Sequence, residues 1–379
     1  MRTPQRMSDR PSTNTEGRER MIRISVSLPE REFAVLESIS SRYAESSGIK
    51  VELRNREPEE PRQGLMTDLT AGDSPDIVMT DGNRVLELAS GGYLLPVDIY
   101  QSVPGDTPLP RLLSQVQWNG YGWGVPLDID PMVIVYAPER LRELGIGGPP
   151  GSREEWQQLL AAAGKQGKYM LSIDPRSPYG MGALLESLGS GLAEADPALL
   201  DWIRGARSRM YYSASDRPEL WERLHTGEVA AAIVPLSVWS GHSSSGLAAS
   251  ALSAGSAPQA LQSRCFALSA QSSSPEEAVA WVTHMTSAAV QREWREQTGR
   301  LPALDEMYRT PQLDASGLSP LQPSQLLEEA ALPQAAGLHW SRLAAAVTAF
   351  LTGKLDTAGY GKEAGLWTQE RVAQPASSF

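Results

Sequence analysis

The sequence predicts an α/β protein with two sheets. Three observations support this prediction: the chain has 379 residues, strand-like and helix-like patterns alternate along most of it, and it begins with a strand–helix–strand unit. Such a unit, of about thirty residues, pairs its strands in parallel. A chain of this length is well beyond what one small core requires, so we expect two domains.

The first unit lies at residues 22–53. Residues 22–28 alternate apolar and polar side chains, as a half-buried strand does, and residues 33–43 place apolar side chains at helical spacing. Gly48 is expected to end this helix, because glycine adopts the left-handed backbone conformation without strain. Residues 49–53 alternate again and form the second strand.

The same alternation continues through the middle of the chain. Ser152 is expected to cap one of these helices. The further helices are expected at 65–71, 85–89, 154–163, 184–192, 197–209 and 219–224, and the strands at 76–80, 132–137 and 229–234.

Residues 120–141 read GYGWGVPLDIDPMVIVYAPERL and join two such regions. Glycine permits backbone angles that other residues avoid and proline fixes its own φ, so this segment can turn sharply at defined positions. Polar groups between two strand-like runs indicate a crossover between two lobes, where a cleft is expected.

The last third of the chain is less regular. Residues 243–263 are rich in Ser, Ala and Gly and are expected to form a surface loop, with a functional lid as the alternative. A strand is expected at 264–270, a helix from Ser274 onward and a late helix at 339–351. Residues 311–337 are expected to be loop, and the tail after Gly365 is expected to fray.

Composition excludes several classes of protein. The formal charge is −11 and no block of basic residues lies beyond the first twenty, which argues against nucleic-acid binding. Cys265 is the only cysteine, so no intrachain disulfide forms, and no run approaches the roughly twenty apolar residues of a membrane span. Residues 1–21 are polar and arginine-rich, and we expect a disordered leader or tether there.

The motifs of common enzymes and metal sites are absent from the sequence. There is no HExxH, GxSxG or GxxxxGK[ST], no Cys–His cluster, and the four histidines are scattered. We therefore expect no enzyme, no metal and no cofactor.

Four segments resemble an extracellular solute-binding protein of ABC transporters, in the maltose-binding-like branch often labelled family 1. They are AGDSPDIV (71–78) with LASGGYLLPVD (88–98); residues 121–144; LHTGEVAAAIV (224–234); and TS (286–287) with Gln291 and TGRLPA (298–303).

The resemblance implies a type II periplasmic-binding-protein fold, two α/β lobes joined by a multi-segment hinge. Lobe 1 is expected to take residues 22–127 plus 260–310, and lobe 2 residues 128–259 plus 311–370. Three segments are expected to cross between the lobes, the first with Pro126 near its pivot, and the lobes close on a ligand.

The resemblance also implies a function. The protein is expected to capture a sugar or oligosaccharide in the cleft and to deliver it to the transmembrane permease subunits of an ABC importer. A monomer is expected, located outside the cytoplasm, either membrane-tethered as a lipoprotein or periplasmic. The alternative is a ligand-sensing binding protein that feeds a signalling or regulatory system.

Aromatic and amide side chains are the first candidate ligand contacts, because sugars need flat apolar faces and paired hydroxyls. Trp239, directly after the strand 229–234, matches a cleft tryptophan of the resembled family, with a core position as the alternative. Tyr179 resembles its aromatic–glycine turn, and Trp340 has a similar claim.

Charged and polar side chains complete the candidate site. Asp81 and Asn83 follow the strand 76–80, at the end of a parallel strand where such sheets bind ligands; an Asx turn there is the alternative, and the two are compatible. The other candidates are Asp128 and Asp130, with hinge capping or a solvated acid pair as the alternative, and Glu30 and Arg31, a pair that would favour a charged ligand.

Overall fold

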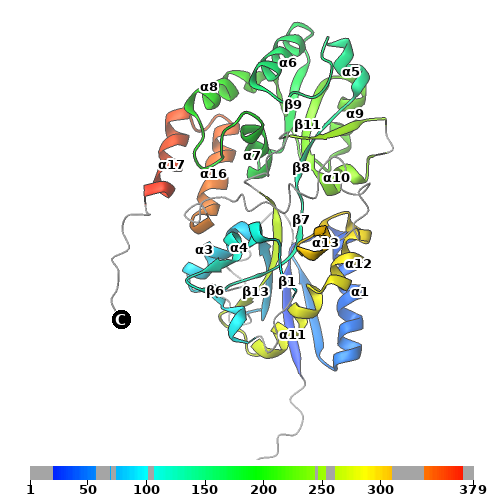
Figure 1. Ribbon diagram of the computed structural model, residues 1–379, viewed down its shortest axis with the longest axis vertical. Coiled ribbons are helices and arrows are strands. Elements are labelled where there is room, and N and C mark those ends of the chain that lie inside the picture. Colours follow the sequence, from blue (N-terminus) through cyan, green and yellow to red (C-terminus); the bar gives the residue numbers. More distant parts are fainter. Residues whose placement is uncertain are drawn as a thin grey trace, which may run out of the picture.

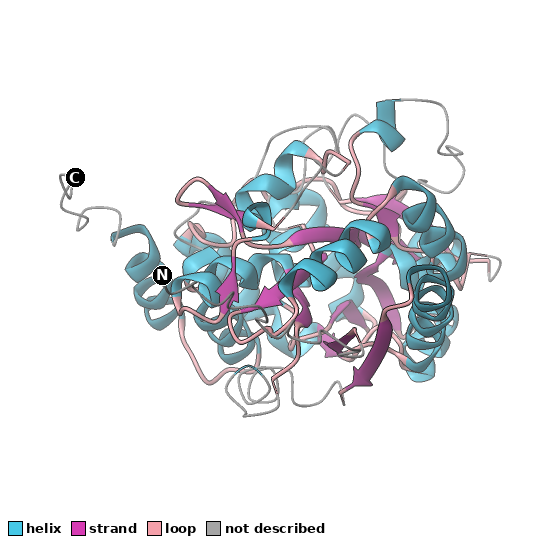
Figure 2. Ribbon diagram, turned by 90° about the horizontal axis from the view of Figure 1, so that it is seen from below, coloured by secondary structure: helices cyan, strands magenta, loops and turns pink. Residues whose placement is uncertain are grey.

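The computed structural model describes residues 20–56, 69, 74–100, 106–243, 246–252, 261–309 and 337–369. The chain forms two lobes, stacked along the long axis of the molecule (Figure 1). Each lobe contains one main sheet, and helices lie on the outside of the strands (Figure 2). We call the lobe that contains β1 lobe 1 and the other lobe 2.

The sheet of lobe 1 has seven strands in the order β14-β7-β13-β3-β1-β2, with β4 paired to β13. Strands β1, β2 and β3 are parallel to one another, and β13 runs antiparallel to β3, β4 and β7. The strands are β1 (Met21–Val26), β2 (Lys50–Asn55), β3 (Ile77–Asp81), β4 (Leu94–Leu95), β7 (Val125–Ile129), β13 (Ser263–Ser269) and β14 (Leu301–Pro302).

The sheet of lobe 2 has five strands in the order β10-β9-β11-β8-β12. Strands β10, β9 and β11 are parallel, and β8 and β12 are antiparallel to their neighbours. The strands are β8 (Met132–Tyr136), β9 (Tyr169–Ile173), β10 (Met210–Tyr212), β11 (Val229–Pro235) and β12 (Ala248–Ala251); a separate hairpin, β5 (Gln117–Trp118) and β6 (Tyr121–Gly122), lies before β7.

Helices cover both sheets. In lobe 1 they are α1 (Glu30–Ser47), α3 (Val85–Ser90), α4 (Pro110–Val116), α11 (Pro275–Met285), α12 (Ala288–Thr298) and α13 (Glu306–Arg309), with 3₁₀ turns η1 (Gly82–Arg84) and η2 (Val97–Ile99). In lobe 2 they are α5 (Pro138–Glu143), α6 (Arg153–Lys165), α7 (Pro178–Ser187), α8 (Pro197–Ala206), α9 (Pro218–Thr226), α10 (Leu236–Ser240), α16 (Trp340–Leu351) and α17 (Thr357–Gln369), with η3 (Arg207–Arg209).

Between β7 and β8 the chain passes from one sheet to the other. Strand β7 ends at Ile129 in the sheet of lobe 1, and β8 begins at Met132 in the sheet of lobe 2, so only Asp130 and Pro131 lie between them. The chain also changes lobe between β12 and β13 and between α13 and α16, and parts of both connections lie outside the described residues.

One buried apolar cluster contains residues of both lobes. Leu109, Ile129 and Leu301 contribute from lobe 1, and Val133 and Leu236 from lobe 2. The remaining clusters lie within single lobes, for example the one in which Trp281 and Trp294 of lobe 1 are buried. Apolar burial therefore continues across the boundary between the lobes instead of stopping at it.

Several expected element ends appear in the structure at the expected residues. Gly48 ends α1 with φ of 70°, and Ser152 caps α6, its Oγ accepting from the backbone N–H of Glu155 at 3.3 Å. The predicted α/β class is confirmed, because each lobe has a helix-covered sheet with parallel strands.

Other expectations of local structure were wrong. Residues 243–263 contain β12 as well as loop, and the chain after Gly365 continues α17 to Gln369. Strands β9 and β10 and helix α12 were not anticipated. The expected leader and the expected helix at 65–71 lie almost wholly outside the described residues, and the expected loop at 311–337 does so except for Gly337.

Candidate functional site

A pocket of about 340 Å³ lies between the lobes. Lobe 1 supplies residues at or just beyond the carboxyl ends of its parallel strands, which is where open α/β sheets bind ligands. Lobe 2 supplies the start of α7 and the first turns of α16. The lining residues are Ser27, Arg56, Met79, Thr80, Asp81, Arg84, Arg176, Pro178, Gln262, Ser263, Arg264, Trp340, Ser341 and Ala344.

Asp81 connects the wall of this pocket to lobe 2. Its two carboxylate oxygens accept from the hydroxyl of Tyr179, at 2.6 and 2.7 Å, and one also accepts from the backbone N–H of Asn83 at 2.9 Å. The last contact is an Asx turn that begins η1 directly after β3. The same carboxylate therefore shapes the turn and lines the pocket.

Asn83 and Trp340 complete this group. The side-chain amide of Asn83 donates to the hydroxyl of Tyr179 at 2.9 Å and to the carbonyl of Leu261 at 3.2 Å. The ring centroids of Tyr179 and Trp340 lie 5.3 Å apart, and the two rings are tilted relative to each other. The structure thus brings together four of the predicted site residues, Asp81, Asn83, Tyr179 and Trp340.

Burial raises the pKa of both partners of the hydrogen bond that joins the lobes, Asp81 and Tyr179. Burial raises the pKa of Asp81, and hydrogen bonds from Tyr179, Asn83 and Trp340 with the charge of Arg84 only partly oppose it. Burial and the adjacent Asp81 carboxylate raise the pKa of Tyr179 well above its ordinary value. Tyr179 therefore keeps its proton and acts as a hydrogen-bond donor.

Asp128 lies in β7 and is fully buried. Its carboxylate accepts from Nε of Arg264 at 3.1 and 3.0 Å, and the Nη2 group of the same arginine forms a further hydrogen bond. The indole N–H of Trp294 donates to it at 2.8 Å. These partners, all from lobe 1, give Asp128 a structural role that was not among the interpretations considered from the sequence.

Asp130 is also buried, at the passage between the sheets. It accepts from the backbone N–H and the hydroxyl of Ser237, at 2.9 and 2.6 Å, and lies 3.2 Å from Nη1 of Arg300. Burial raises the pKa of Asp130 despite the opposing charge of Arg300 and the hydrogen bonds from Ser237. Its contacts tie the first turn of helix α10 in lobe 2 to an arginine of lobe 1, which corresponds to the hinge-capping alternative.

Glu32 joins these two groups into one network. It pairs with Arg264 and lies 3.2 Å from Nε of Arg300. Burial disfavours its charge, but the two arginines outweigh burial and lower the pKa of Glu32. Two arginines and three carboxylates, Glu32, Asp128 and Asp130, thus form a largely buried ionic network where the lobes meet.

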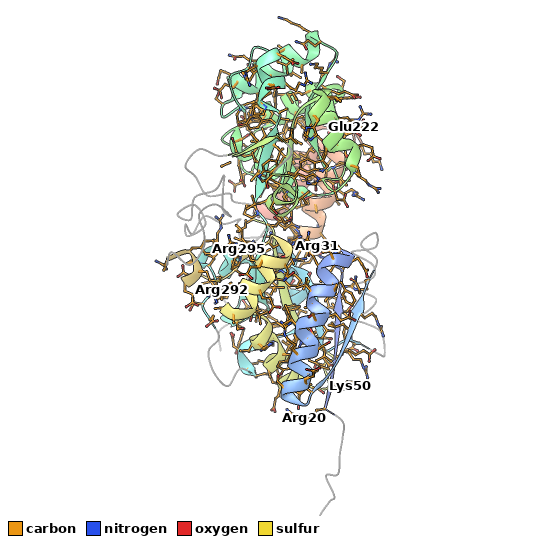
Figure 3. The ribbon with its side chains drawn as sticks, turned by 90° about the vertical axis from the view of Figure 1, so that its right-hand side faces the viewer. Arg20, Arg31, Lys50, Glu222, Arg292 and Arg295 are labelled. Carbon is orange, nitrogen blue, oxygen red and sulfur yellow. The ribbon has the colours of Figure 1, made fainter. Side chains whose placement is uncertain are left out.

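The structure places the remaining predicted residues outside the pocket. Trp239 lies in α10, is 8% exposed and belongs to the apolar cluster shared by the lobes, which corresponds to the core alternative. Glu30 and Arg31 are exposed in the first turn of α1, and Nη2 of Arg31 donates to the carbonyl of Gln297 at 2.9 Å. Figure 3 shows Arg31 at the end of α1 nearest lobe 2.

The arginines of the pocket were missed by the sequence analysis. Arg56 directly follows β2, Arg84 ends η1, and Arg176 lies in the turn between β9 and α7. Arg264 is the second residue of β13, which is antiparallel and therefore begins at the same edge of the sheet. A search for cations just beyond predicted parallel strands would have found the first two; β9 had to be recognised before Arg176 could be placed.

Two further observations concern the described residues only. No group of three or more His, Cys, Asp or Glu side chains there is arranged to hold a metal ion. None of the described helices has the length and apolar character that a membrane span needs.

Comparison with curated proteins finds partial matches. The maltodextrin-binding protein MdxE of Bacillus subtilis is 25% identical over 121 residues, which cover 31% of this chain and 28% of that protein. A maltooligosaccharide ABC transporter solute-binding lipoprotein of Streptococcus pneumoniae is 24% identical over 136 residues, covering 36% and 31%. The chain thus matches about a third of the length of these relatives.

Solved structures match along nearly the whole chain. The GacH receptor of Streptomyces glaucescens, solved unliganded and with acarbose, has a TM-score of 0.71 and 21% identity over 92% of this chain and 97% of its own. UgpB from Mycobacterium tuberculosis, in complex with glycerophosphocholine, has a TM-score of 0.72 and 16% identity over 93% and 99%. At these identities the matches establish the fold, which confirms the predicted periplasmic-binding-protein architecture.

The family comparison covers most of the chain. Residues 38–319 match the family described as bacterial extracellular solute-binding protein. This range includes most of the sheet of lobe 1 and all of the sheet of lobe 2. The chain therefore belongs to the family of bacterial extracellular solute-binding proteins.

Proposed function

We propose that this protein captures a small sugar in the pocket between its lobes and delivers it to the permease of an ABC importer. The observation that carries the proposal is the pocket itself, which is lined from both lobes at the carboxyl ends of the parallel strands. The names of two relatives, a maltodextrin-binding protein and a maltooligosaccharide ABC transporter solute-binding lipoprotein, support a saccharide ligand, an extracytoplasmic location and a transmembrane partner. We also propose that the protein acts as a monomer.

Pocket size favours a short ligand. A volume of about 340 Å³ lies at the lower end of the range of ligand sites, roughly 300–1,000 Å³. This volume suits a ligand of one or two sugar rings better than a long oligosaccharide. Trp340, which lines the pocket and packs on Tyr179, is the aromatic side chain that we assign to the sugar face.

The lobes are proposed to close around the ligand. Asp81 of lobe 1 and Tyr179 of lobe 2 hold the closed arrangement, because their hydrogen bond joins the lobes beside the pocket. We assign lobe 1 the described residues up to Ile129 and those of 263–309, and lobe 2 those from Met132 to Ala251 and from Trp340 onward.

A thermal-shift screen over sugars, polyols and amino acids tests the saccharide assignment, followed by calorimetry on the hits. A sugar is expected to bind with a Kd of about 1 μM or tighter, roughly −8 kcal/mol. Stabilisation by amino acids alone would refute the saccharide and leave the fold untouched.

Two tryptophan variants test the position of the site. Trp340→Phe is expected to weaken binding of the best sugar of the screen, because Trp340 lines the pocket. Trp239→Phe is expected to lower stability and leave the Kd unchanged, because Trp239 packs in the shared apolar cluster. Equal loss of affinity in both variants would place the ligand elsewhere.

A further inference from the structure

The pocket carries the opposite charge to the rest of the molecule. Among the described residues, four arginines, Arg56, Arg84, Arg176 and Arg264, line it against one carboxylate, Asp81, so that this part of the lining has a formal charge of +3. The whole chain has a formal charge of −11. The fixed positive charge of these arginines therefore lies where a ligand would enter, and it attracts anions.

Hydrogen bonds and ion pairs hold several of these guanidinium groups in place. Nε of Arg56 donates to the hydroxyl of Ser25 at 2.8 Å, and Nε of Arg176 lies 3.4 Å from the Asp174 carboxylate. Arg264 is held by Asp128 behind the pocket wall. Side chains held in this way lose little further freedom when a ligand binds, which favours affinity.

Asp81, the one carboxylate of the lining, is already engaged. Both of its oxygens accept from the Tyr179 hydroxyl, and one also accepts from the Asn83 backbone. Arginine offers only donors, whereas the hydroxyls of a neutral sugar both donate and accept. The described lining also holds five side chains that can both donate and accept, those of Ser27, Thr80, Gln262, Ser263 and Ser341. The donor-only arginines still outnumber the carboxylate by four to one, so the lining favours a ligand that is rich in acceptors.

The buried hydroxyl of Thr80, in the same pocket, also needs a hydrogen-bond acceptor. Thr80, next to Asp81, lines the pocket, is 6% exposed, and its Oγ1 has no hydrogen-bond partner among the described residues. A buried hydroxyl without a partner costs free energy unless a ligand or water satisfies it. An oxygen of a bound anion would accept from it.

The start of α7 adds a favourable field. Pro178, the first residue of this ten-residue helix, lines the pocket, and Ser177 before it makes no side-chain capping bond. The amino end of a helix carries a partial positive charge and favours anions nearby. This field supplements the arginines and would be insufficient by itself.

We propose that the solute is an anionic sugar derivative, bearing a phosphate or a carboxylate that Arg56, Arg84 and Arg176 bind. Arg264, whose charge is shared with Asp128 and Glu32, serves to hold the wall and contributes less to the anion. The inference rests on the proposed function, since it names the class of solute that the same pocket takes.

Calorimetry on the full chain with matched ligands tests the inference. Each aldohexose of a panel is offered as the neutral sugar, as its 6-phosphate and as its uronate, and inorganic phosphate is offered alone. One charged form is expected to bind at least about tenfold more tightly than its neutral parent, because charge-assisted hydrogen bonds are stronger than neutral ones. The advantage is expected to shrink as salt rises, and the preferred form distinguishes phosphate from carboxylate.

Variants locate the effect. Arg56→Gln and Arg84→Gln are each expected to weaken binding of the charged form more than binding of its neutral parent, so that most of the tenfold preference is lost. Arg142→Gln is the control, because it removes the same charge from an exposed position on α5 that does not line the pocket. Circular dichroism and the melting temperature of each variant without ligand show that the fold is kept.

The outcomes separate this inference from the proposed function. Tighter binding of a neutral sugar than of its charged forms overturns the anionic solute and leaves sugar binding in place. Inorganic phosphate that binds as tightly as every sugar phosphate overturns the sugar part of the inference. Binding of no member of the panel overturns both proposals, and a preference kept in both pocket variants overturns the assigned arginines.

Discussion

The hydroxyl of Tyr179 lies 2.6 Å from one carboxylate oxygen of Asp81 and 2.7 Å from the other, so that one donor joins α7 of lobe 2 to the end of β3 in lobe 1. Asp81 is also a wall of the pocket. The position of the lobes and the shape of the pocket are therefore coupled through one hydrogen-bonded pair.

Tyr179→Phe is expected to loosen the closed arrangement. It deletes the donor and leaves a buried carboxylate with fewer partners, which costs about 1–3 kcal/mol. Urea denaturation measures the loss, and small-angle scattering is expected to show a larger radius of gyration. Tyr360→Phe is the control, since it removes a buried hydrogen bond to Leu192 within lobe 2. Equal radii for the two variants would contradict a role for Tyr179 in closure.

The contribution of Asp81 to the free energy of unfolding is expected to fall as pH rises. Because burial raises the pKa of Asp81 above its ordinary 3.8, the folded state binds this proton more tightly than the unfolded chain. The stabilisation is fully present below pH 3.8 and is lost as pH rises through the raised pKa. In urea denaturation, the free energy of unfolding of Asp81→Asn relative to the wild type is expected to rise from about pH 4 to about pH 7.

Glu32→Gln provides a control of opposite sign. The pKa of Glu32 is lowered from 4.5, so the stability that its charge provides is present above pH 4.5 and lost as pH falls through the lowered value. The deficit of Glu32→Gln relative to the wild type is expected to be largest near neutral pH. Parallel pH profiles for the Asp81 and Glu32 variants would show that the two carboxylates are not shifted in opposite directions.

Arg264→Met is expected to destabilise the protein strongly. Arg264 and Arg300 together face the buried carboxylates of Asp128 and Asp130 and the partly buried carboxylate of Glu32. Removal of Arg264 leaves Asp128 without its bidentate partner. Breaking a buried ion pair by deleting one member costs about 3–5 kcal/mol. Equilibrium unfolding in urea measures it.

A second substitution is expected to restore part of this loss. In Asp128→Asn/Arg264→Met the stranded charge is gone, so the double variant should recover at least about 1 kcal/mol relative to Arg264→Met. A double variant that is less stable than Arg264→Met by the full cost of Asp128→Asn would rule out direct coupling between the two side chains.

Gly299→Ala is expected to cost more than Gly48→Ala. Both glycines end helices of lobe 1 with positive φ, 76° and 70°, where a side chain costs about 1–2 kcal/mol. A Cβ at Gly48 would meet open space, whereas a Cβ at Gly299 would lie 2.6 Å from the Oγ of Ser240 in lobe 2. Melting temperatures of the two variants test the difference, and equal losses would mean that Ser240 moves aside freely.

Local signals in the sequence predicted the architecture well. Alternating side chains at β1 and β2, the glycine after α1 and the serine before α6 each act within a few residues, and each appears in the structure where expected. Strand β9 was missed because its Met170 and Leu171 form a short buried run without alternation, and such a run looks the same in a helix.

The site was predictable where side chains follow a strand directly and harder to predict where they depend on distant packing. Asp81 and Asn83 were found by their place at the end of β3 and just after it. Trp239 also follows a strand, yet it is buried in the apolar cluster shared by the lobes. Glu30 and Arg31 were proposed and Glu32 was missed, because the helical phase that turns Glu32 toward Arg264 is set by the packing of α1 within lobe 1.

The apolar cluster shared by the lobes restricts how the molecule opens. Residues of α10 and β8 pack there with residues of α4 and β14, whereas α16, which lines the pocket, lies on the opposite side of the molecule from α10 and α13 (Figure 1). Separation at the cluster would expose apolar surface to water, at about 25 cal/mol for each Å². The lobes are therefore expected to separate on one side only, with the packed apolar cluster as the pivot. The entrance of the pocket then faces away from this cluster, and a solute has one direction of approach.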